Sequence, residues 1–234
     1  MITVNKKLLK SLRRKSGVID MCEDEKKSCA NCGVFNCFRR DKSFPEFCLT
    51  ENTSQKEIDE VNELYLNDEE TRRLAISAAE IEGEFYGMIT RVEEIAEFAK
   101  RIGAKKIGIA TCVGLLNEAR IFANFLKHKG LEPYAVACKV GGTDKTKIGI
   151  KEELKLQPGC HESLCNPVLQ ARLLNKEKTD LNVIVGLCVG HDSLFIKNSD
   201  APVTTLITKD RVLGHNPAAA LYTSGFYYKK LFQD

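Results

Sequence analysis

The chain has 234 residues, 43% hydrophobic and 29% charged, a balance that suits one substantial core with a small appended module. Its formal charge is only +3, and 35 basic residues are scattered among 32 acidic ones, which argues against a surface that follows a nucleic-acid backbone. No apolar run is long enough for a signal-peptide core or a membrane span, so we expect a cytoplasmic protein that binds neither nucleic acid nor membrane.

The residue pattern divides the chain into four segments. Residues 1–21 are rich in Lys and Arg and are expected to form a solvated basic tail. A cysteine-rich metal-binding module follows at 22–53, and a helical scaffold at 54–104. The remaining segment, 105–234, is predicted to be an α/β domain that carries a second cysteine site.

Cysteine is the most informative residue type, with ten in the chain. Four of them are spaced as Cys29-x2-Cys32-x4-Cys37-x10-Cys48. Close-set cysteines in a reducing compartment hold metal more often than they form disulfides. The segment 22–53 shows no helical or alternating periodicity, so we expect a bound metal, rather than a core, to hold it together. Cys22 is then a spare thiol.

Helical periodicity begins at residue 54. Apolar residues between 58 and 65 recur at helical spacing, and Asn67 or Asp68 is placed to cap a second helix that carries Leu74 and Ile81. A third helix is predicted to open with a capping box at 90–93 and to end at Gly103. We interpret these helices as scaffold.

Beyond residue 105, short apolar runs alternate with helical segments. Strands are predicted at 107–110, 134–137, 183–187 and 203–207, and helices at 118–129 and 168–174. Continuous apolar runs separated by helices are typical of a parallel sheet covered on both faces. The predicted fold class is therefore α/β, with a parallel-sheet, Rossmann-like domain preceded by helices and by the small cysteine-rich module.

Four more cysteines fall at one end of the predicted sheet. Cys112, Cys138 and Cys188 close or follow the first three strands, and Cys165 lies just before a helix. Ligands of open parallel sheets bind outside the carboxyl ends of the strands. We therefore predict that these thiols share a cofactor-binding metal site, with Cys160 as a substitute ligand. The alternative is that each is a buried structural cysteine.

The amino-terminal spacing favours a [4Fe–4S] cluster over zinc. Zinc modules usually offer two close pairs of ligands, whereas one close pair is followed here by two single cysteines, Cys37 and Cys48. Three nearby thiolates with a more distant fourth resemble several iron–sulfur sites, although the spacing is not that of a ferredoxin. The strand-end cysteines are candidates for a second cluster, and three ligands would leave one iron open to a substrate. Zinc is the alternative metal.

Histidines and a glycine-rich loop complete the candidates. His191 lies three residues after Cys188 and, with Asp192 beside it, is a candidate to donate a proton or bond to a cluster sulfur. His215 follows the fourth predicted strand and is a third catalytic candidate. For the histidines, the alternative is a loop residue satisfied by local hydrogen bonds. The loop 141–146 lacks the spacing of a phosphate loop and is interpreted as a lid or as simple turns.

Three separated motifs carry a resemblance to a known family. They are Cys29-Ala30-Asn31-Cys32-Gly33-Val34, the block VGLCVGHDSLF at 185–195 and the block KDRVLGHNP at 209–217. Together they resemble an uncharacterised prokaryotic family of cysteine-rich, metal-binding proteins, over nearly all of the chain after residue 28. The resemblance implies metal binding and brings no reaction with it. The cysteines that it implies as ligands are Cys29, Cys32, Cys37, Cys48, Cys112, Cys138, Cys165 and Cys188.

Two classes of function follow from these observations. The leading hypothesis is an iron–sulfur protein whose amino-terminal cluster passes electrons to, or braces, the strand-end site. A small molecule would be reduced or lose sulfur there, as in an oxidoreductase or a desulfidase, and a redox partner protein is the other expected partner. The alternative is a non-catalytic, zinc-stabilised binding or metal-delivery protein.

Overall fold

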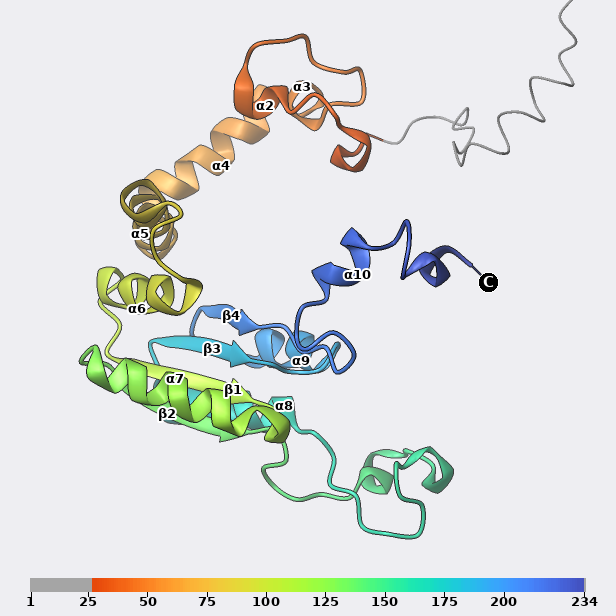
Figure 1. Ribbon diagram of the computed structural model, residues 1–234. Helices are drawn as coiled ribbons and strands as arrows, with labels where there is room; N and C mark the ends of the chain where they lie inside the picture. The colour runs from red at the N-terminus through yellow and green to blue at the C-terminus, as the bar shows by residue number, and fades with distance from the viewer. Residues whose placement is uncertain (1–26, 234) are drawn as a thin grey trace, which may run out of the picture. The chain divides into compact units, whose positions relative to one another are not determined.

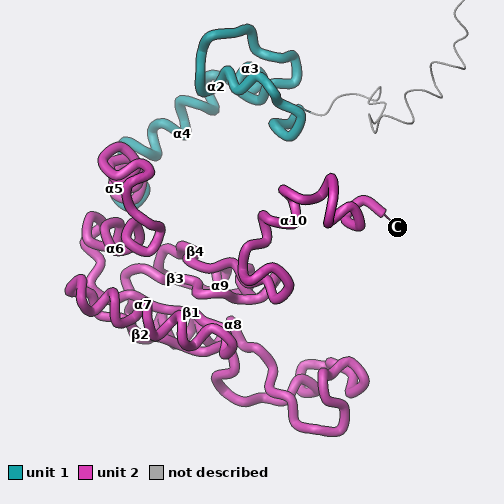
Figure 2. Tube along the Cα trace, viewed as in Figure 1, with its two compact units in different colours: residues 1–72 teal, residues 73–234 magenta. Residues whose placement is uncertain are grey.

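The computed structural model describes residues 27–233, and the chain divides into two compact units, Met1–Arg72 and Arg73–Asp234 (Figures 1 and 2). The basic tail predicted at 1–21 and the spare thiol Cys22 lie outside the described residues. The division falls inside a helix, within the segment predicted as scaffold, so that segment contributes to both units. No helix among the described residues combines the length and the apolarity that a bilayer crossing needs.

The first unit consists of short helical turns and one longer helix. Its elements are η1 (Cys29–Asn31), α2 (Asn36–Arg39), α3 (Leu49–Asn52) and α4 (Gln55–Asn67). Asn36, 3% exposed, is the one buried residue among those described in this unit. Its side-chain amide donates to the Lys42 carbonyl at 2.6 Å, and its Oδ1 accepts from the Lys42 N–H at 2.9 Å. The described part of the unit therefore has polar contacts in place of a hydrophobic core.

Two predicted helix starts are confirmed by their caps. Asp68 Oδ1 accepts from the Thr71 N–H at 2.7 Å at the start of α5 (Glu69–Phe85). The capping box between Thr90 and Glu93 opens α6 (Arg91–Arg101). These side chains satisfy backbone donors that have no partner inside the helix.

The second unit is built on a four-stranded parallel sheet in the order β2-β1-β3-β4 (Figure 1). The strands are β1 (Lys106–Thr111), β2 (Glu132–Ala137), β3 (Leu181–Val185) and β4 (Val203–Ile207). The longer helices are α7 (Leu116–His128), α8 (Pro167–Lys176) and α9 (His191–Asn198). Shorter pieces are η2 (Val113–Leu115), η3 (Lys145–Ile148), η4 (Glu152–Leu154), α10 (Ala218–Tyr222) and η5 (Lys229–Phe232). The predicted α/β class with a parallel sheet is confirmed.

The third strand ends at Val185, earlier than its apolar run predicts. Gly186 has a φ of +70° and turns the chain out of the strand just before Leu187. The apolar run in the sequence extends beyond the end of the strand because Leu187 is also buried, at 2% exposed. The short helix α9, which begins at His191, has no counterpart among the predicted elements.

Each face of the sheet has its own core. Side chains of α6 and α7 cover one face, and side chains of α8 and α9 cover the other. The central strands β1 and β3 are buried almost throughout, whereas the edge strands β2 and β4 are partly exposed. Two helical layers thus cover the two faces of the sheet.

Gly108 in β1 allows α8 to approach the sheet closely. A Cβ atom at this position would lie 1.9 Å from Asn182 Oδ1 and 2.8 Å from Leu174 Cδ1. Asn182 is fully buried, accepts from the Thr179 hydroxyl at 2.8 Å and donates to the Ser199 hydroxyl at 2.7 Å. Because both ends of this amide are bonded, it has little freedom to move aside.

We predict that Gly108→Ala lowers the free energy of unfolding by about 1–3 kcal/mol, the usual cost of inserting an atom into a packed interior. Urea denaturation measures the change. The matched control is Gly83→Ala, where the added Cβ in α5 meets open space and is expected to stabilise the helix by roughly 0.5–1 kcal/mol. Equal stability of the two variants would contradict the prediction.

Candidate functional site

The carboxyl ends of the parallel strands open on one edge of the sheet. Strands β1 and β3 are neighbours, and the connection from β1 to β2 runs in the opposite direction to the connection from β3 to β4. Such a crevice is where open α/β sheets bind ligands. Cys112 follows β1 directly, Cys138 follows β2 directly, and Cys188 lies three residues beyond β3. This edge is the candidate site.

Three thiols lie near one another at this edge. Cys138 is close enough to Cys165 and to Cys112 to affect the charge on both sulfurs. The Asn166 N–H donates to the Cys138 carbonyl at 2.7 Å, which ties the start of α8 to the end of β2. Cys165 is therefore brought to the strand ends by a backbone bond one residue beyond it.

A buried amide fixes the strand ends beneath the thiols. Gln170 Nε2 donates to the carbonyls of Thr111 at 3.1 Å and of Val136 at 2.7 Å. Thr111 immediately precedes Cys112, and Val136 lies two residues before Cys138. Gln170 is fully buried, and its Oε1 has no hydrogen-bond partner among the described residues. The separation of the first two strand ends is thus set by one side chain of α8.

Cationic side chains surround the thiols. Lys209 Nζ lies 2.5 Å from Cys112 Sγ, and Arg211 Nη2 lies 2.9 Å from Cys188 Sγ. Both cations come from the loop after β4. Lys139 is close enough to Cys165 to favour its charged form, and its ammonium also donates to the Ser163 carbonyl. The edge is therefore a set of thiols within a positive environment.

The hydrogen bonds set the protonation of the thiols. The bond from Cys138, helped by Lys139 and His191, lowers the pKa of Cys165 to about 5. The same bond, together with burial, raises the pKa of Cys138. Burial also opposes charge on Cys112, but hydrogen bonds from Lys209 and the Gly114 N–H outweigh it and lower that pKa. At neutral pH the arrangement is a Cys165 thiolate that accepts from a Cys138 thiol.

The thiols open into a pocket of about 580 Å³. Its lining includes Cys112, Cys165, Cys188, His191, Lys209 and Arg211. One wall comes from residues 145–164, which belong to the connection between β2 and α8. A pocket of this size suits a small molecule.

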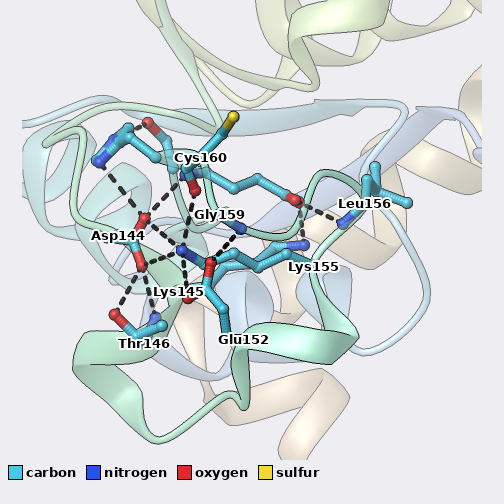
Figure 3. Close-up of polar contacts among 11 residues, drawn as sticks. Asp144, Lys145, Thr146, Glu152, Lys155, Leu156, Gly159 and Cys160 are labelled. Carbon is cyan, nitrogen blue, oxygen red and sulfur yellow. Dashed lines mark hydrogen bonds and ion pairs between the residues drawn. The ribbon is translucent and has the colours of Figure 1, made fainter.

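The connection between β2 and α8 is organised around Asp144 (Figure 3). The Asp144 carboxylate accepts from the N–H and hydroxyl of Thr146, from the Glu162 N–H at 2.8 Å and from Lys155 Nζ at 3.1 Å. These bonds, above all the one from the Thr146 N–H, hold the pKa of Asp144 far below its usual range. The Lys155 side chain is only 4% exposed. We call residues 139–166 the lobe.

The glycine-rich stretch at 141–146 forms the entry to the lobe. Gly141 and Gly142 have φ angles of +89° and +58°, which are typical of glycine in a turn. This agrees with the interpretation of the stretch as simple turns. Cys160 is exposed in the lobe, and its carbonyl accepts from Lys155 at 3.0 Å. The Cys160 side chain is not among those that line the pocket.

The three predicted catalytic residues lie in different settings. His191 lines the pocket and begins α9. Asp192 is the next residue of that helix and accepts from the Ser193 N–H at 2.8 Å. His215 has a φ of +66°, and its Nδ1 accepts from the Asp210 N–H at 3.1 Å in a local turn. Of the three, His191 is the one that faces the thiol pocket.

The amino-terminal cysteines lie in the first unit and are accessible. Cys29 and Cys37 are exposed, Cys32 and Cys48 are partly exposed, and all four are free thiols. Within residues 27–233, no group of three or more His, Cys, Asp and Glu side chains is arranged to hold a metal ion as it stands. Metal binding by either cysteine set therefore stays a prediction.

The cations Lys139, Lys209 and Arg211 were missed by sequence reasoning. The signal that could have found them is the rule that loops after all parallel strands converge on one edge. Applied to the fourth predicted strand, it places the Lys209-Asp210-Arg211 stretch beside the cysteines.

We predict that Cys165 in the reduced, metal-free protein is alkylated by iodoacetamide with an inflection near pH 5, because the thiolate is the nucleophile. At pH 6 its rate should exceed that of free N-acetylcysteine roughly tenfold, since its larger thiolate fraction outweighs its lower intrinsic nucleophilicity. Mass spectrometry of the labelled peptides measures the rate.

The control is Cys160→Ala, which should leave that inflection in place. Cys138→Ala removes the largest cause of the shift, so the inflection should move to higher pH. An inflection at the ordinary thiol value of about 8.5 in the unmodified protein would contradict the assignment.

Comparisons with known proteins show a family and bring no activity. A family model described as "Protein of unknown function (DUF1847)" matches residues 48–206. An uncharacterized protein of Methanocaldococcus jannaschii, MJ0455, is 48% identical over 188 residues, which are 80% of this chain and 95% of that protein. No solved structure matches the chain. The family match includes the four strand-end cysteines and begins at Cys48, and the chain accordingly belongs to the DUF1847 family of proteins of unknown function.

Proposed function

We propose that the strand-end thiols hold an iron–sulfur cluster and that a small molecule in the adjoining pocket is reduced or loses sulfur there. The observation that carries the proposal is the meeting of four cysteines from distant parts of the chain at one edge of the sheet. Cys112, Cys165 and Cys188 line the pocket, and Cys138 is close enough to Cys112 and Cys165 to affect the charge on both. Thiolate is the ligand that iron–sulfur clusters require.

The chemistry of the donor set fits such a centre. Cys165 is already a thiolate at neutral pH, and the pKa of Cys112 is lowered despite burial, because Lys209 and a backbone N–H bond to it. Metal ligation would have to remove the proton that Cys138 donates to Cys165 and rotate the sulfurs out of their hydrogen bonds. When bound, a cluster supplies single-electron transfer and, with three protein ligands, an open iron.

The remaining side chains have defined roles in this proposal. Lys209 and Arg211 stabilise negative charge on sulfur and on an anionic substrate, since each bonds to a cysteine in the pocket. Reductive removal of sulfur from an organic thiol consumes two electrons and two protons, replaces the carbon–sulfur bond with a carbon–hydrogen bond and releases hydrogen sulfide. We assign the electrons to a protein redox partner, one proton to His191, which lines the pocket, and the other proton to solvent water.

A zinc-stabilised binding or metal-delivery protein is the second candidate, and one observation favours it. Four thiolates around a single zinc at 2.3 Å lie about 3.8 Å apart. In a cluster each thiolate binds a different iron, so the sulfurs stand farther apart. Cys112, Cys138 and Cys165 interact closely enough to affect the charge on one another's sulfurs, which favours a site built around a single ion.

We predict iron and acid-labile sulfide in equal amounts after anaerobic purification, about four of each per chain for one loaded site and about eight for two. Elemental analysis and a sulfide assay measure both. Stoichiometric zinc without sulfide would reject the cluster and support the second candidate.

Two double variants assign the metal to its sites. Cys112→Ser with Cys188→Ser should abolish loading at the sheet edge, and Cys29→Ser with Cys32→Ser should abolish loading in the first unit. If both sites load, each pair lowers the iron content by about half. Cys160→Ser is the matched control, because this thiol is exposed and does not line the pocket.

A further prediction concerns the first unit, whose described residues bury a single polar side chain. If metal holds residues 27–53 together, chelation should speed tryptic cleavage at Arg39, Arg40 and Lys42 at least tenfold, while cleavage within α7 stays slow because that helix packs on a core. Timed proteolysis with and without chelator measures the rates. Unchanged cleavage at these three residues would show that the module does not depend on metal.

A further inference from the structure

We propose that the pocket at the sheet edge binds small molecules with an anionic end and an aliphatic body. This inference names a substrate class for the proposed function. Any reaction of the bound molecule rests on that function, whereas the binding itself does not. It comes from one feature that thiol chemistry leaves unexplained, the apolar wall that the lobe presents to the pocket.

The wall consists of large aliphatic side chains that are exposed to solvent. Leu154 and Leu156 are 67% and 88% exposed, and Ile148 and Ile150 are 61% and 37% exposed. All four line the pocket of about 580 Å³. Single exposed aliphatics are common, but several gathered on one concave surface mark a binding site.

Positive charge predominates among the ionisable side chains that line the pocket. Four cationic side chains, Lys139, Lys145, Lys209 and Arg211, line it with a single carboxylate, Glu162, which is paired with Lys145. Lysine has three donors and arginine five, so Lys209 and Arg211 keep donors beyond the bonds that they make to sulfur. These donors suit a carboxylate, a sulfonate or a thiolate on a ligand.

The lobe holds its aliphatic side chains on a fixed backbone (Figure 3). The Leu156 N–H donates to Glu162 Oε2 at 2.7 Å, and the Gly159 N–H donates to Glu152 Oε1 at 2.8 Å. Lys155, whose side chain is 4% exposed, lies between the two leucines and bonds to Asp144. A preformed wall lowers the entropic cost of binding.

Isothermal titration of the reduced protein with octanoate tests the proposal, with octyltrimethylammonium and acetate as comparison ligands. Octanoate should bind at least tenfold more tightly than either, because it alone has both the negative charge and the chain. Leu154→Ser with Leu156→Ser should weaken octanoate binding roughly tenfold. The control is Ile121→Ser, which alters an aliphatic side chain of α7 that is 70% exposed and outside the pocket lining.

Two results would overturn the inference. One is that octanoate binds no more tightly than octyltrimethylammonium, or that its affinity is the same in the double leucine variant as in the unmodified protein. The other is a dimer that the leucine variant converts to a monomer in light scattering, which would make the wall an interface between copies of the chain.

Iron and sulfide analysis of the same samples separates the two proposals. Loading retained in the leucine variant while octanoate binding is lost supports the binding role of the wall. If the anaerobically purified protein binds octanoate but contains neither iron nor sulfide, the cluster proposal is rejected and the binding proposal is retained.

Discussion

The parallel pairing of β1 with both of its neighbours is the constraint on which the site depends. Thr111, the last residue of β1, pairs with Ala137 on one side and with Val185 on the other, so the three strands end at one level. The residues that follow therefore emerge together. If β2 ran antiparallel, its carboxyl end would lie about 20 Å away, the length of a six-residue strand at about 3.3 Å per residue. The cysteine after it would then belong to the opposite edge of the sheet.

Gathering thiols at one edge carries an electrostatic cost that the fourth strand helps to offset. Several neighbouring buried sulfurs cannot all be ionised at once. In the metal-free protein, Cys138 keeps its proton and Cys165 carries the negative charge. Strand β4 pairs parallel with β3, so the loop after it returns to the same edge and delivers Lys209 and Arg211 to the sulfurs. Burial opposes charge on Cys112, and without Lys209 only the Gly114 N–H and Cys138 would remain to lower its pKa.

Much of the fold could be predicted from local patterns, whereas the site depends on contacts that no local pattern contains. The capping box at Thr90 and the four apolar runs placed helices and strands because those signals act within a few residues. The strand-end rule also located the cysteines. The bond from Lys209 to Cys112 spans 97 positions, and the Asp144 network joins residues whose pairing follows only once the lobe is folded. Gly186 shows the same limit, because a continuous apolar run does not reveal where the backbone turns.

The metal-free edge and the proposed metal-bound edge compete for the same sulfur atoms. Cys165 would give up no proton to a metal near neutral pH, whereas Cys138, whose pKa is raised, would give up its proton last. Loading under the proposed function is therefore limited by Cys138, and it must also break the bond from Lys209 to Cys112. An ammonium released in this way has no second partner among the described residues and is left facing the pocket. A ligand carboxylate that accepts from it would then stabilise the loaded state, which couples substrate binding to retention of the metal.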